Sequence, residues 1–264
     1  MKNEIVSQFT TECPWRDTLY WYSSVDSTNT LAKQMAKRGA PHGTVLVAKE
    51  QSGGRGRMGR SFLSPTGGVY LSVILRPVCT PDKLMHLTCA TAVAGCKAVE
   101  NACGICPDIK WTNDLVVGRK KLGGILTELA LSADGLVDYA IVGIGINCCQ
   151  KADDFPPELR ELATSVQAVT GNACSPAKLA ASLIEALWEM DKGLLSQKAE
   201  IMDAYRKNCI TLGKEISVVR GESVSHGTAL DLDEDGGLVV RFSDGSEKVV
   251  TSGEVSVRGM YGYL

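Results

Sequence analysis

Two long strand patterns joined by a tight turn constrain the fold of this chain more than any other feature of its sequence. They cover residues 121–131 and 137–147, with Asp134-Gly135 between them. Aspartate followed by glycine favours a β-hairpin because glycine adopts the left-handed backbone conformation without steric cost. A hairpin becomes stable only when other elements cover its apolar face. The sequence therefore predicts an α+β fold in which helices pack on an antiparallel or mixed sheet.

Patterns along the rest of the chain agree with an α+β fold and divide the chain into two parts. Beyond residue 212, short strand patterns alternate with turns at Asp235-Gly236 and Asp244-Gly245, which is typical of a small β-barrel. We therefore expect two domains, residues 1–211 and residues 212–264. In the first domain we expect helices over 26–39, 81–104, 176–192 and 198–208, and further strands over 44–50, 69–77, 109–111 and 115–117.

The charge and hydropathy of the chain exclude several classes of function. With 28 lysines and arginines against 30 aspartates and glutamates, the formal net charge is -2, which argues against a general surface for nucleic acids. The longest apolar runs, such as residues 139–146, are too short to cross a bilayer. The N-terminal residues lack the basic and apolar regions of a signal peptide. We expect a cytoplasmic protein with no membrane partner.

Ten cysteines raise the question of disulfides or a metal site. Most of them stand singly in apolar patterns, as small buried hydrophobic residues do in a reducing compartment. The one CxxC motif, Cys103 to Cys106, has no second cysteine pair at zinc-finger spacing, and the three histidines lie far from it in the sequence. The sequence therefore predicts no metal site.

A loop rich in glycine and arginine is the main chemical feature of the N-terminal half. Residues 54–60 read GRGRMGR, which formally satisfies the GxGxxG pattern, but the following SFLSP does not open the helix that a dinucleotide site requires. No GK[ST] follows either, so the P-loop pattern fails. Glycines let a ligand approach the backbone, and the arginines Arg55, Arg57 and Arg60 suit carboxylate and phosphate groups. The loop therefore predicts a site for a pair of anions, with a solvated basic turn as the alternative.

Three further segments place polar side chains or glycines where strands begin or end. KWTND at residues 110–114 offers an amide and a carboxylate at a turn, and KLGGIL at residues 121–126 sets Lys121 beside two glycines. GIGIN at residues 143–147 ends its strand with two small positions and an amide. These patterns indicate a ligand wall, although a surface lysine before a bulge would also explain the second of them.

Together these segments resemble the biotin protein ligases. Ser27-Thr28-Asn29 at a helix start, Gln51 before GRGRMGR, KWTND, KLGGIL and GIGIN occur in the order and spacing of that family. The resemblance runs from residue 27 to about residue 258 and includes the C-terminal strand patterns up to Gly253–Arg258. It differs at Thr112, where the family often has proline, and at Met58, where it has a third arginine-type residue. The resemblance implies a class II synthetase-like catalytic domain followed by an SH3-like β-barrel.

The resemblance also implies a reaction and its site. Biotin would be activated by ATP, with Mg²⁺, to biotinyl-5′-AMP, and then joined to a lysine of a biotin carboxyl carrier protein such as that of acetyl-CoA carboxylase. Lys121, Arg57 and Arg60 would stabilise the charge that develops during activation. The implied biotin-binding positions are Ser27, Thr28, Asn29, Gln51, Gly54, Arg55, Gly56, Arg57, Lys121 and Gly124. The implied ATP-binding positions are Arg57, Arg60, Phe62, Lys110, Asn113, Asp114 and Asn147.

Three alternatives remain at the level of sequence. A lipoate or octanoate ligase or transferase has a similar fold, but the arginine-rich loop followed by a C-terminal barrel favours biotin. A biotin-responsive repressor would need an N-terminal helix-turn-helix domain, and the 26 residues before Ser27 are too few for one, so no DNA binding is expected. A biotin-binding module without catalysis would be expected to lack Lys121 or the arginines. The sequence leaves open whether the protein forms a homodimer.

Overall fold

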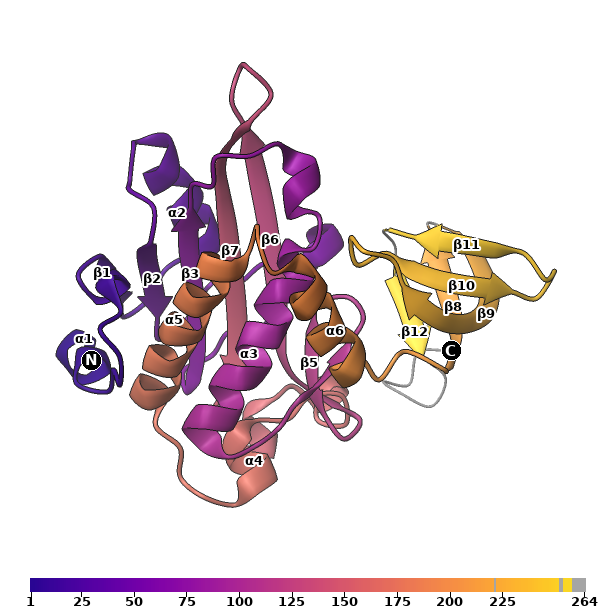
Figure 1. Cartoon of the computed structure of the whole chain (residues 1–264). Helices are drawn as coiled ribbons and strands as arrows, with labels where there is room; N and C mark the ends of the chain where they lie inside the picture. The colour runs from indigo at the N-terminus through magenta and orange to yellow at the C-terminus, as the bar shows by residue number, and fades with distance from the viewer. Residues whose placement is uncertain (221, 252–253, 258–264) are drawn as a thin grey trace.

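The computed structural model describes residues 1–220, 222–251 and 254–257, which form a larger unit and a smaller one (Figure 1). Within these residues, the larger unit is built on a seven-stranded sheet of order β1-β2-β3-β7-β6-β5-β4. β1 pairs with β2 in parallel, and the other neighbours are antiparallel, so the sheet is mixed. Its strands are β1 Leu19–Tyr22, β2 Thr44–Ala48, β3 Gly68–Leu75, β4 Asp108–Lys110, β5 Asp114–Val117, β6 Lys120–Leu131 and β7 Val137–Asn147.

The predicted hairpin is the centre of this sheet. β6 and β7 pair antiparallel over most of their length, and Gly135 in the turn between them adopts the left-handed conformation with φ 81°. β3 pairs with β7 on the other side, from Gly68 opposite Asn147 to Leu75 opposite Ala140. The expectation of an α+β fold around this hairpin is confirmed.

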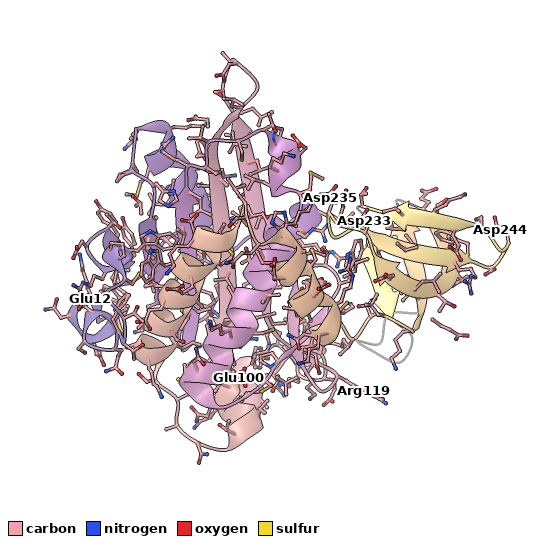
Figure 2. All side chains as sticks on the ribbon, in the orientation of Figure 1. Glu12, Glu100, Arg119, Asp233, Asp235 and Asp244 are labelled. Carbon is pink, nitrogen blue, oxygen red and sulfur yellow. The ribbon has the colours of Figure 1, made fainter. Side chains whose placement is uncertain are left out.

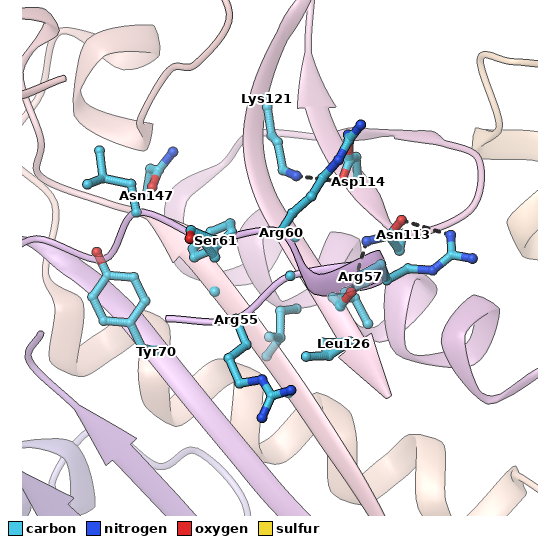
Figure 3. A pocket seen from close by; sticks show the side chains of 18 of the residues that line it. Arg55, Arg57, Arg60, Ser61, Tyr70, Asn113, Asp114, Lys121, Leu126 and Asn147 are labelled. Atoms are coloured by element: carbon cyan, nitrogen blue, oxygen red, sulfur yellow. Dashed lines mark hydrogen bonds and ion pairs between the residues drawn. The ribbon is translucent and has the colours of Figure 1, made fainter. Parts of the chain in front are cut away.

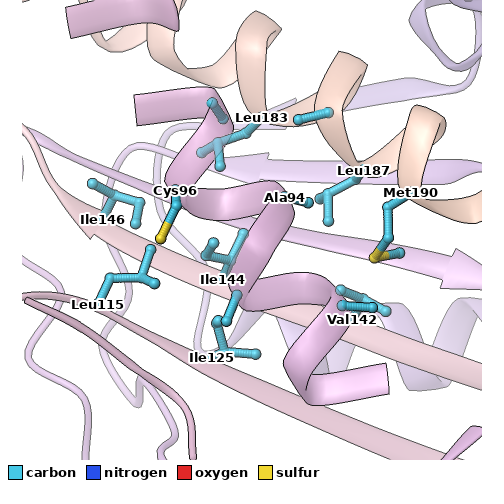
Figure 4. Close-up of a cluster of buried hydrophobic side chains, with 14 of the residues drawn as sticks. Ala94, Cys96, Leu115, Ile125, Val142, Ile144, Ile146, Leu183, Leu187 and Met190 are labelled. Atoms are coloured by element: carbon cyan, nitrogen blue, oxygen red, sulfur yellow. The ribbon is translucent and has the colours of Figure 1, made fainter. Parts of the chain in front are cut away.

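Helices cover both faces of the sheet. α3 Leu87–Cys103 and α5 Pro176–Gly193 pack on one face, where Cys96, Ile144 and Leu183 belong to the main buried cluster (Figure 4). α2 Thr28–Lys37 packs on the other face, and its Ala32 and Ala36 lie in a smaller buried cluster with residues of β2, β3 and β7. α6 Lys198–Asn208 follows α5 and leads to the smaller unit, and the shorter α1 Lys2–Val6 and α4 Val166–Thr170 complete the set of α-helices in the described residues. No helix among the described residues is long and apolar enough to cross a membrane.

The prediction of one helix over 81–104 is wrong at its start. A 3-10 turn covers Pro81–Leu84, and α3 begins only at Leu87. Between them the backbone of His86 leaves helical geometry, with ψ 3°, where its buried ring bonds through Nε2 to the carbonyl oxygen of Leu194 at 2.9 Å. The far end is as expected, because Gly104 caps the helix in the left-handed conformation. The sequence patterns also missed α1, β1 and α4.

The smaller unit is an antiparallel, SH3-like sheet. The described residues give it five strands in the order β11-β10-β9-β8-β12, and they record no pairing between the outer strands β11 and β12, so the predicted barrel is not closed. Gly253 and Arg258, which the sequence resemblance included, lie outside the described residues. The strands are β8 Glu215–Arg220, β9 Ser223–Leu232, β10 Leu238–Phe242, β11 Glu247–Val250 and β12 Glu254–Val257.

The smaller unit contacts the larger one through the turn between β9 and β10. The indole nitrogen of Trp111 donates to the carbonyl of Gly236 at 2.8 Å, and Lys198 forms an ion pair with Asp235 at 2.6 Å. Figure 2 shows Asp233 and Asp235 at this near edge and Asp244 at the opposite tip of the unit. Trp111 belongs to the KWTND segment, so this segment of the larger unit contacts the smaller unit.

Candidate functional site

A pocket of about 290 Å³ opens on the sheet. It lies between the N-terminus of α2, the loop of residues 54–62, which we call the arginine loop, and the ends of β5, β6 and β7. It brings together every predicted site residue except Gly54. Gly54 is buried at the start of this loop, and a side chain there would collide with the carbonyl of Phe62. The predicted residues that line the pocket are Ser27, Thr28, Asn29, Gln51, Arg55, Gly56, Arg57, Arg60, Phe62, Lys110, Asn113, Asp114, Lys121, Gly124 and Asn147.

Neutral hydrogen-bonding groups gather at the N-terminus of α2. Ser27 caps the helix, accepting from the amide of Thr30 at 3.4 Å. The backbone amide of Thr28 donates to Oε1 of Gln51 at 2.8 Å, so the start of α2 is bonded to the segment that follows β2. Asn29 donates through Nδ2 to the carbonyl of Leu126 at 3.1 Å. These side chains form a network of neutral amide and hydroxyl groups that reaches one carboxylate, since Asn29 also donates through Nδ2 to Oε2 of Glu128 at 3.0 Å.

A buried serine that the sequence patterns did not indicate links this network to the sheet. Ser72 of β3 is fully buried, and its hydroxyl lies 2.8 Å from Oγ1 of Thr28 and 2.6 Å from Oδ1 of Asn29. A serine in an otherwise apolar strand was a weak signal, since a buried hydroxyl needs a partner. Gly143 of β7 makes room for the same network, because a side chain there would collide with the amide of Asn29.

The arginine loop is a small hairpin in the structure rather than an irregular turn. The amide of Gly56 donates to the carbonyl of Arg60 at 2.7 Å, and the amide of Phe62 donates to the carbonyl of Gly54 at 2.9 Å. At the tip, Met58 takes the left-handed conformation with φ 56° and is exposed. This fold lets the arginine side chains leave the loop in different directions, as Figure 3 shows for Arg55, Arg57 and Arg60.

Arg57 points toward the turn that precedes β5. Its Nη1 donates to Oδ1 of Asn113 at 3.3 Å, and Asn113 is held in turn by its Nδ2 bond to the carbonyl of Ile125 at 2.9 Å (Figure 3). Burial lowers the pKa of Arg57 from its ordinary value, and the negative charge of Asp114 opposes that change. A guanidinium remains charged in proteins, so Arg57 is a fixed, partly desolvated cation in the pocket wall.

Lys121 lies on the same side of the pocket and is paired with a carboxylate. Its Nζ is 2.7 Å from Oδ1 of Asp114 (Figure 3) and 5.7 Å from the centre of the Phe62 ring. β6 carries Lys121, and β5 carries Asp114, so the pair depends on the pairing of these strands. The ammonium is thus placed beside the pocket before any substrate binds.

Two glycines without side chains form the floor beneath Phe62. Gly124 of β6 and Gly145 of β7 are direct cross-strand partners. A Cβ atom on Gly145 would lie 2.6 Å from the Phe62 ring, and one on Gly124 would lie 3.1 Å from that ring and 3.3 Å from Nζ of Lys121. The glycines therefore allow an aromatic ring and a lysine to lie directly on the sheet.

One wall of the pocket comes from the segment between β7 and α4, to which the sequence patterns assigned no helix or strand. The segment contains two 3-10 turns, Ala152–Asp154 and Pro157–Leu159, and it supplies the lining residues Phe155, Leu159, Leu162 and Ala163. It is tied to Lys121, because the amide of Lys121 donates to the carbonyl of Leu162 and the amide of Thr164 donates to the carbonyl of Lys121. Asn147 also joins it, through Nδ2 to the carbonyl of Thr164 at 2.9 Å.

Comparison with known proteins gives two family matches and several close relatives. The model of the Biotin/lipoate A/B protein ligase family matches residues 21–147, and the model of the Biotin protein ligase C terminal domain matches residues 211–258. The chain is 34% identical over 236 residues to the bifunctional ligase/repressor BirA of Bacillus subtilis, covering 89% of this chain and 72% of that protein. It is 32% identical over 239 residues to the biotin–[acetyl-CoA-carboxylase] ligase of Paracoccus denitrificans, covering 89% of this chain and 98% of that protein.

A solved structure agrees with these matches. The biotin protein ligase from Aquifex aeolicus in complex with biotin and ATP is similar to this chain with a TM-score of 0.76 and 32% identity. The similarity covers 91% of this chain and 98% of that one.

Proposed function

The chain belongs to the biotin protein ligase family and is an ATP-dependent biotin ligase, and we propose that it works through biotinyl-5′-AMP bound in the pocket on the sheet. The observation that carries this proposal is the division of the pocket into two parts. Neutral groups from Ser27, Thr28 and Gln51 form one part, and Arg57 and Lys121 with their partners form the other. A ureido ring needs neutral donors and acceptors, whereas a carboxylate beside a triphosphate needs cations.

The proposed first step joins the two substrates. A carboxylate oxygen of biotin attacks the α-phosphorus of ATP, an O–P bond forms, and the bond to the departing pyrophosphate breaks. Both reactants are anions, so fixed cations from Arg57, Arg60 and Lys121 lower the cost of bringing them together. Phe62, which lies on Gly124 and Gly145 beside Lys121, would cover the adenine.

The proposed second step transfers biotin to protein. The amine of an acceptor lysine attacks the acyl carbon of the mixed anhydride, forms an amide and releases AMP. Positioning is sufficient for this step because the anhydride is already activated, so the protein needs no nucleophile of its own. The acceptor is a biotin carboxyl carrier domain such as that of acetyl-CoA carboxylase. Because the reaction needs ATP and this acceptor, we place it in the cytoplasm.

We propose that magnesium arrives with ATP rather than at a dedicated protein site. Mg²⁺ usually binds substrate phosphates, water and one or two carboxylates. Asp114 supplies a carboxylate among the described lining residues, and it is shared with Lys121. Phosphate oxygens and water would therefore provide most of the ligands. We further propose that residues 1–211 carry the reaction and that residues 212–264 form the unit that contacts Trp111.

Biotin is expected to drive exchange of pyrophosphate into ATP without any acceptor protein, because adenylation is a separate and reversible step. The measurement is incorporation of labelled pyrophosphate into ATP with biotin, lipoate or octanoate as the acid. Exchange with biotin alone is the expected result. Exchange with lipoate or octanoate but not with biotin would contradict the proposed substrate and favour a lipoate or octanoate enzyme of the same fold.

Biotin with ATP is expected to protect the arginine loop from trypsin. The hairpin over residues 54–62 carries three arginines whose side chains leave it in different directions, and pairing with a carboxylate and a phosphate would hold the loop in one conformation. Cleavage after Arg55, Arg57 and Arg60 should therefore slow strongly when both substrates are present. Arg119, in the exposed turn between β5 and β6 (Figure 2), is the internal control, and its cleavage rate should not change. Equal loop cleavage in both states would show that the loop does not close over the intermediate.

A further inference from the structure

Among the described residues, two adjacent cysteines at the end of β7, Cys148 and Cys149, meet a third, Cys174, from 25 positions further along the chain. Sγ of Cys148 lies 2.7 Å from Sγ of Cys174, and Sγ of Cys149 lies 3.2 Å from the same atom. Cys148 is fully buried, whereas Cys149 and Cys174 are partly exposed. The sequence patterns did not predict this meeting of Cys148, Cys149 and Cys174, which we call the thiol cluster.

The thiol cluster joins the two ends of the segment that walls the pocket. Cys148 and Cys149 directly follow Asn147, and Cys174 directly precedes Ser175, the cap of α5. Between them lies the stretch that brings Phe155 and Leu162 to the pocket. A covalent bond across the cluster would close this stretch into a loop and reduce the conformations open to it when it unfolds.

The three sulfurs differ in how readily they lose a proton. The hydrogen bond from the Cys148 thiol lowers the pKa of Cys174 to about 7, against an ordinary value of 9.0. The same contact, with burial, raises the pKa of Cys148. Burial raises the pKa of Cys149 to about 11. Cys174, which is partly exposed and contacts both other sulfurs, is therefore the most readily ionised thiol of the cluster, an arrangement suited to thiol oxidation.

Spacing and charge favour a bond between sulfurs over a shared metal ion. Zinc–sulfur bonds of about 2.3 Å in a tetrahedral site hold sulfurs roughly 3.8 Å apart. The two contacts of Cys174 are shorter than this. The described residues offer these three ligands and no fourth His, Cys, Asp or Glu within the group. A disulfide is neutral, which suits a partly buried place better than a cluster of thiolates does.

We propose that the thiol cluster is an oxidation site at which a hydroperoxide converts Cys174 and Cys148 into a reversible disulfide that closes the pocket-wall segment. With hydrogen peroxide, the Cys174 thiolate attacks one oxygen, the O–O bond breaks, and hydroxide leaves, so Cys174 becomes a sulfenic acid; an organic hydroperoxide releases an alcohol in the same step. The Cys148 thiol then loses its proton, its sulfur attacks the Cys174 sulfur, and water leaves. The two thiols lose two electrons in total, and the peroxide gains them. Cys149 remains reduced. This inference does not depend on the proposed ligase reaction.

The test treats the full-length protein with a small excess of hydrogen peroxide and follows it by mass spectrometry and thermal unfolding. The oxidised protein should lose two hydrogens in mass, and its non-reduced tryptic digest should join peptide 122–151 to peptide 161–178. The unfolding midpoint should rise by about 5 °C or more and return to its first value with dithiothreitol. The C148S and C174S variants should each lose the linked peptides and the rise in the midpoint.

Two further variants make the proposal falsifiable. C106S removes an exposed cysteine that donates to Glu100 outside the thiol cluster, and it should leave the link and the midpoint shift unchanged. C149S should also keep the link. If C149S abolished the link and C148S kept it, the assignment of Cys148 would be wrong. One equivalent of zinc on the reduced protein, lost in C174S, together with no peptide link after peroxide, would show a metal site instead and overturn the proposal.

Discussion

Replacing Lys121 with alanine is expected to lower the rate of biotin-dependent pyrophosphate exchange by about 10²–10³, the usual loss when one group that stabilises transition-state charge is removed. The ammonium stands 2.7 Å from Asp114 at the edge of the pocket, where the biotin carboxylate and the α-phosphate are proposed to meet. Alanine leaves the negative charge of Asp114 in place and takes away the cation, so the two anionic substrates meet added repulsion.

The fold of the Lys121→Ala variant should persist, because partly exposed ion pairs contribute little to stability. Lys121 is 32% exposed in this pair, and its backbone bonds to Leu162 and Thr164 do not require its side chain. Single-turnover adenylation and thermal unfolding, measured on the same sample, separate chemistry from folding.

The neighbouring lysine is a matched control for Lys121. Lys120 bonds to the carbonyl of Arg160 and pairs with Glu161, and it does not line the pocket. The Lys120→Ala variant should therefore catalyse pyrophosphate exchange at nearly the wild-type rate. Wild-type adenylation by a folded Lys121→Ala variant, or an equal loss in both variants, would contradict the role given to Lys121.

Replacing Gly124 with valine is expected to reduce kcat/KM for pyrophosphate exchange by about 10- to 100-fold, because overpacking a close-fitting site costs about 1–3 kcal/mol. A single Cβ atom at this position would already stand 3.1 Å from Phe62 and 3.2 Å from Cε of Lys121. The two methyl groups of valine extend further, so they push both side chains off the floor or fill the space that substrate needs. Gly124→Ala should give a smaller loss in the same direction.

Leu129→Val is the matched control for the glycine substitution. Leu129 lies on the same strand, β6, but is exposed and outside the pocket, and valine suits a strand at both positions. Its exchange rate should remain unchanged. Exchange by Gly124→Val at the wild-type rate, with unchanged KM for biotin and ATP, would show that the glycine floor does not border the substrates.

Local signals in the sequence determined the secondary structure and the class of fold. Asp134-Gly135 predicted the hairpin of β6 and β7, and Gly104 marked the end of α3, because turns and caps depend on the conformational freedom of one or two residues. His86 shows the limit of this reasoning. The helix begins directly after His86, whose ring bonds to Leu194, 108 positions away, and no local pattern indicates such a contact.

The composition of the candidate site was also present in the sequence, because glycine and arginine together, and lysine beside glycine, are uncommon in a packed core and indicate a ligand. The tertiary structure alone decided how those residues meet: Lys121 against Asp114, Ser72 between Thr28 and Asn29, Phe62 over the glycine floor. It also decided that the segment carrying Phe155 is a pocket wall and that Cys174 meets Cys148. Sequence patterns act over a few neighbouring residues, whereas these contacts join distant strands and loops and exist only once the sheet and its helices have packed.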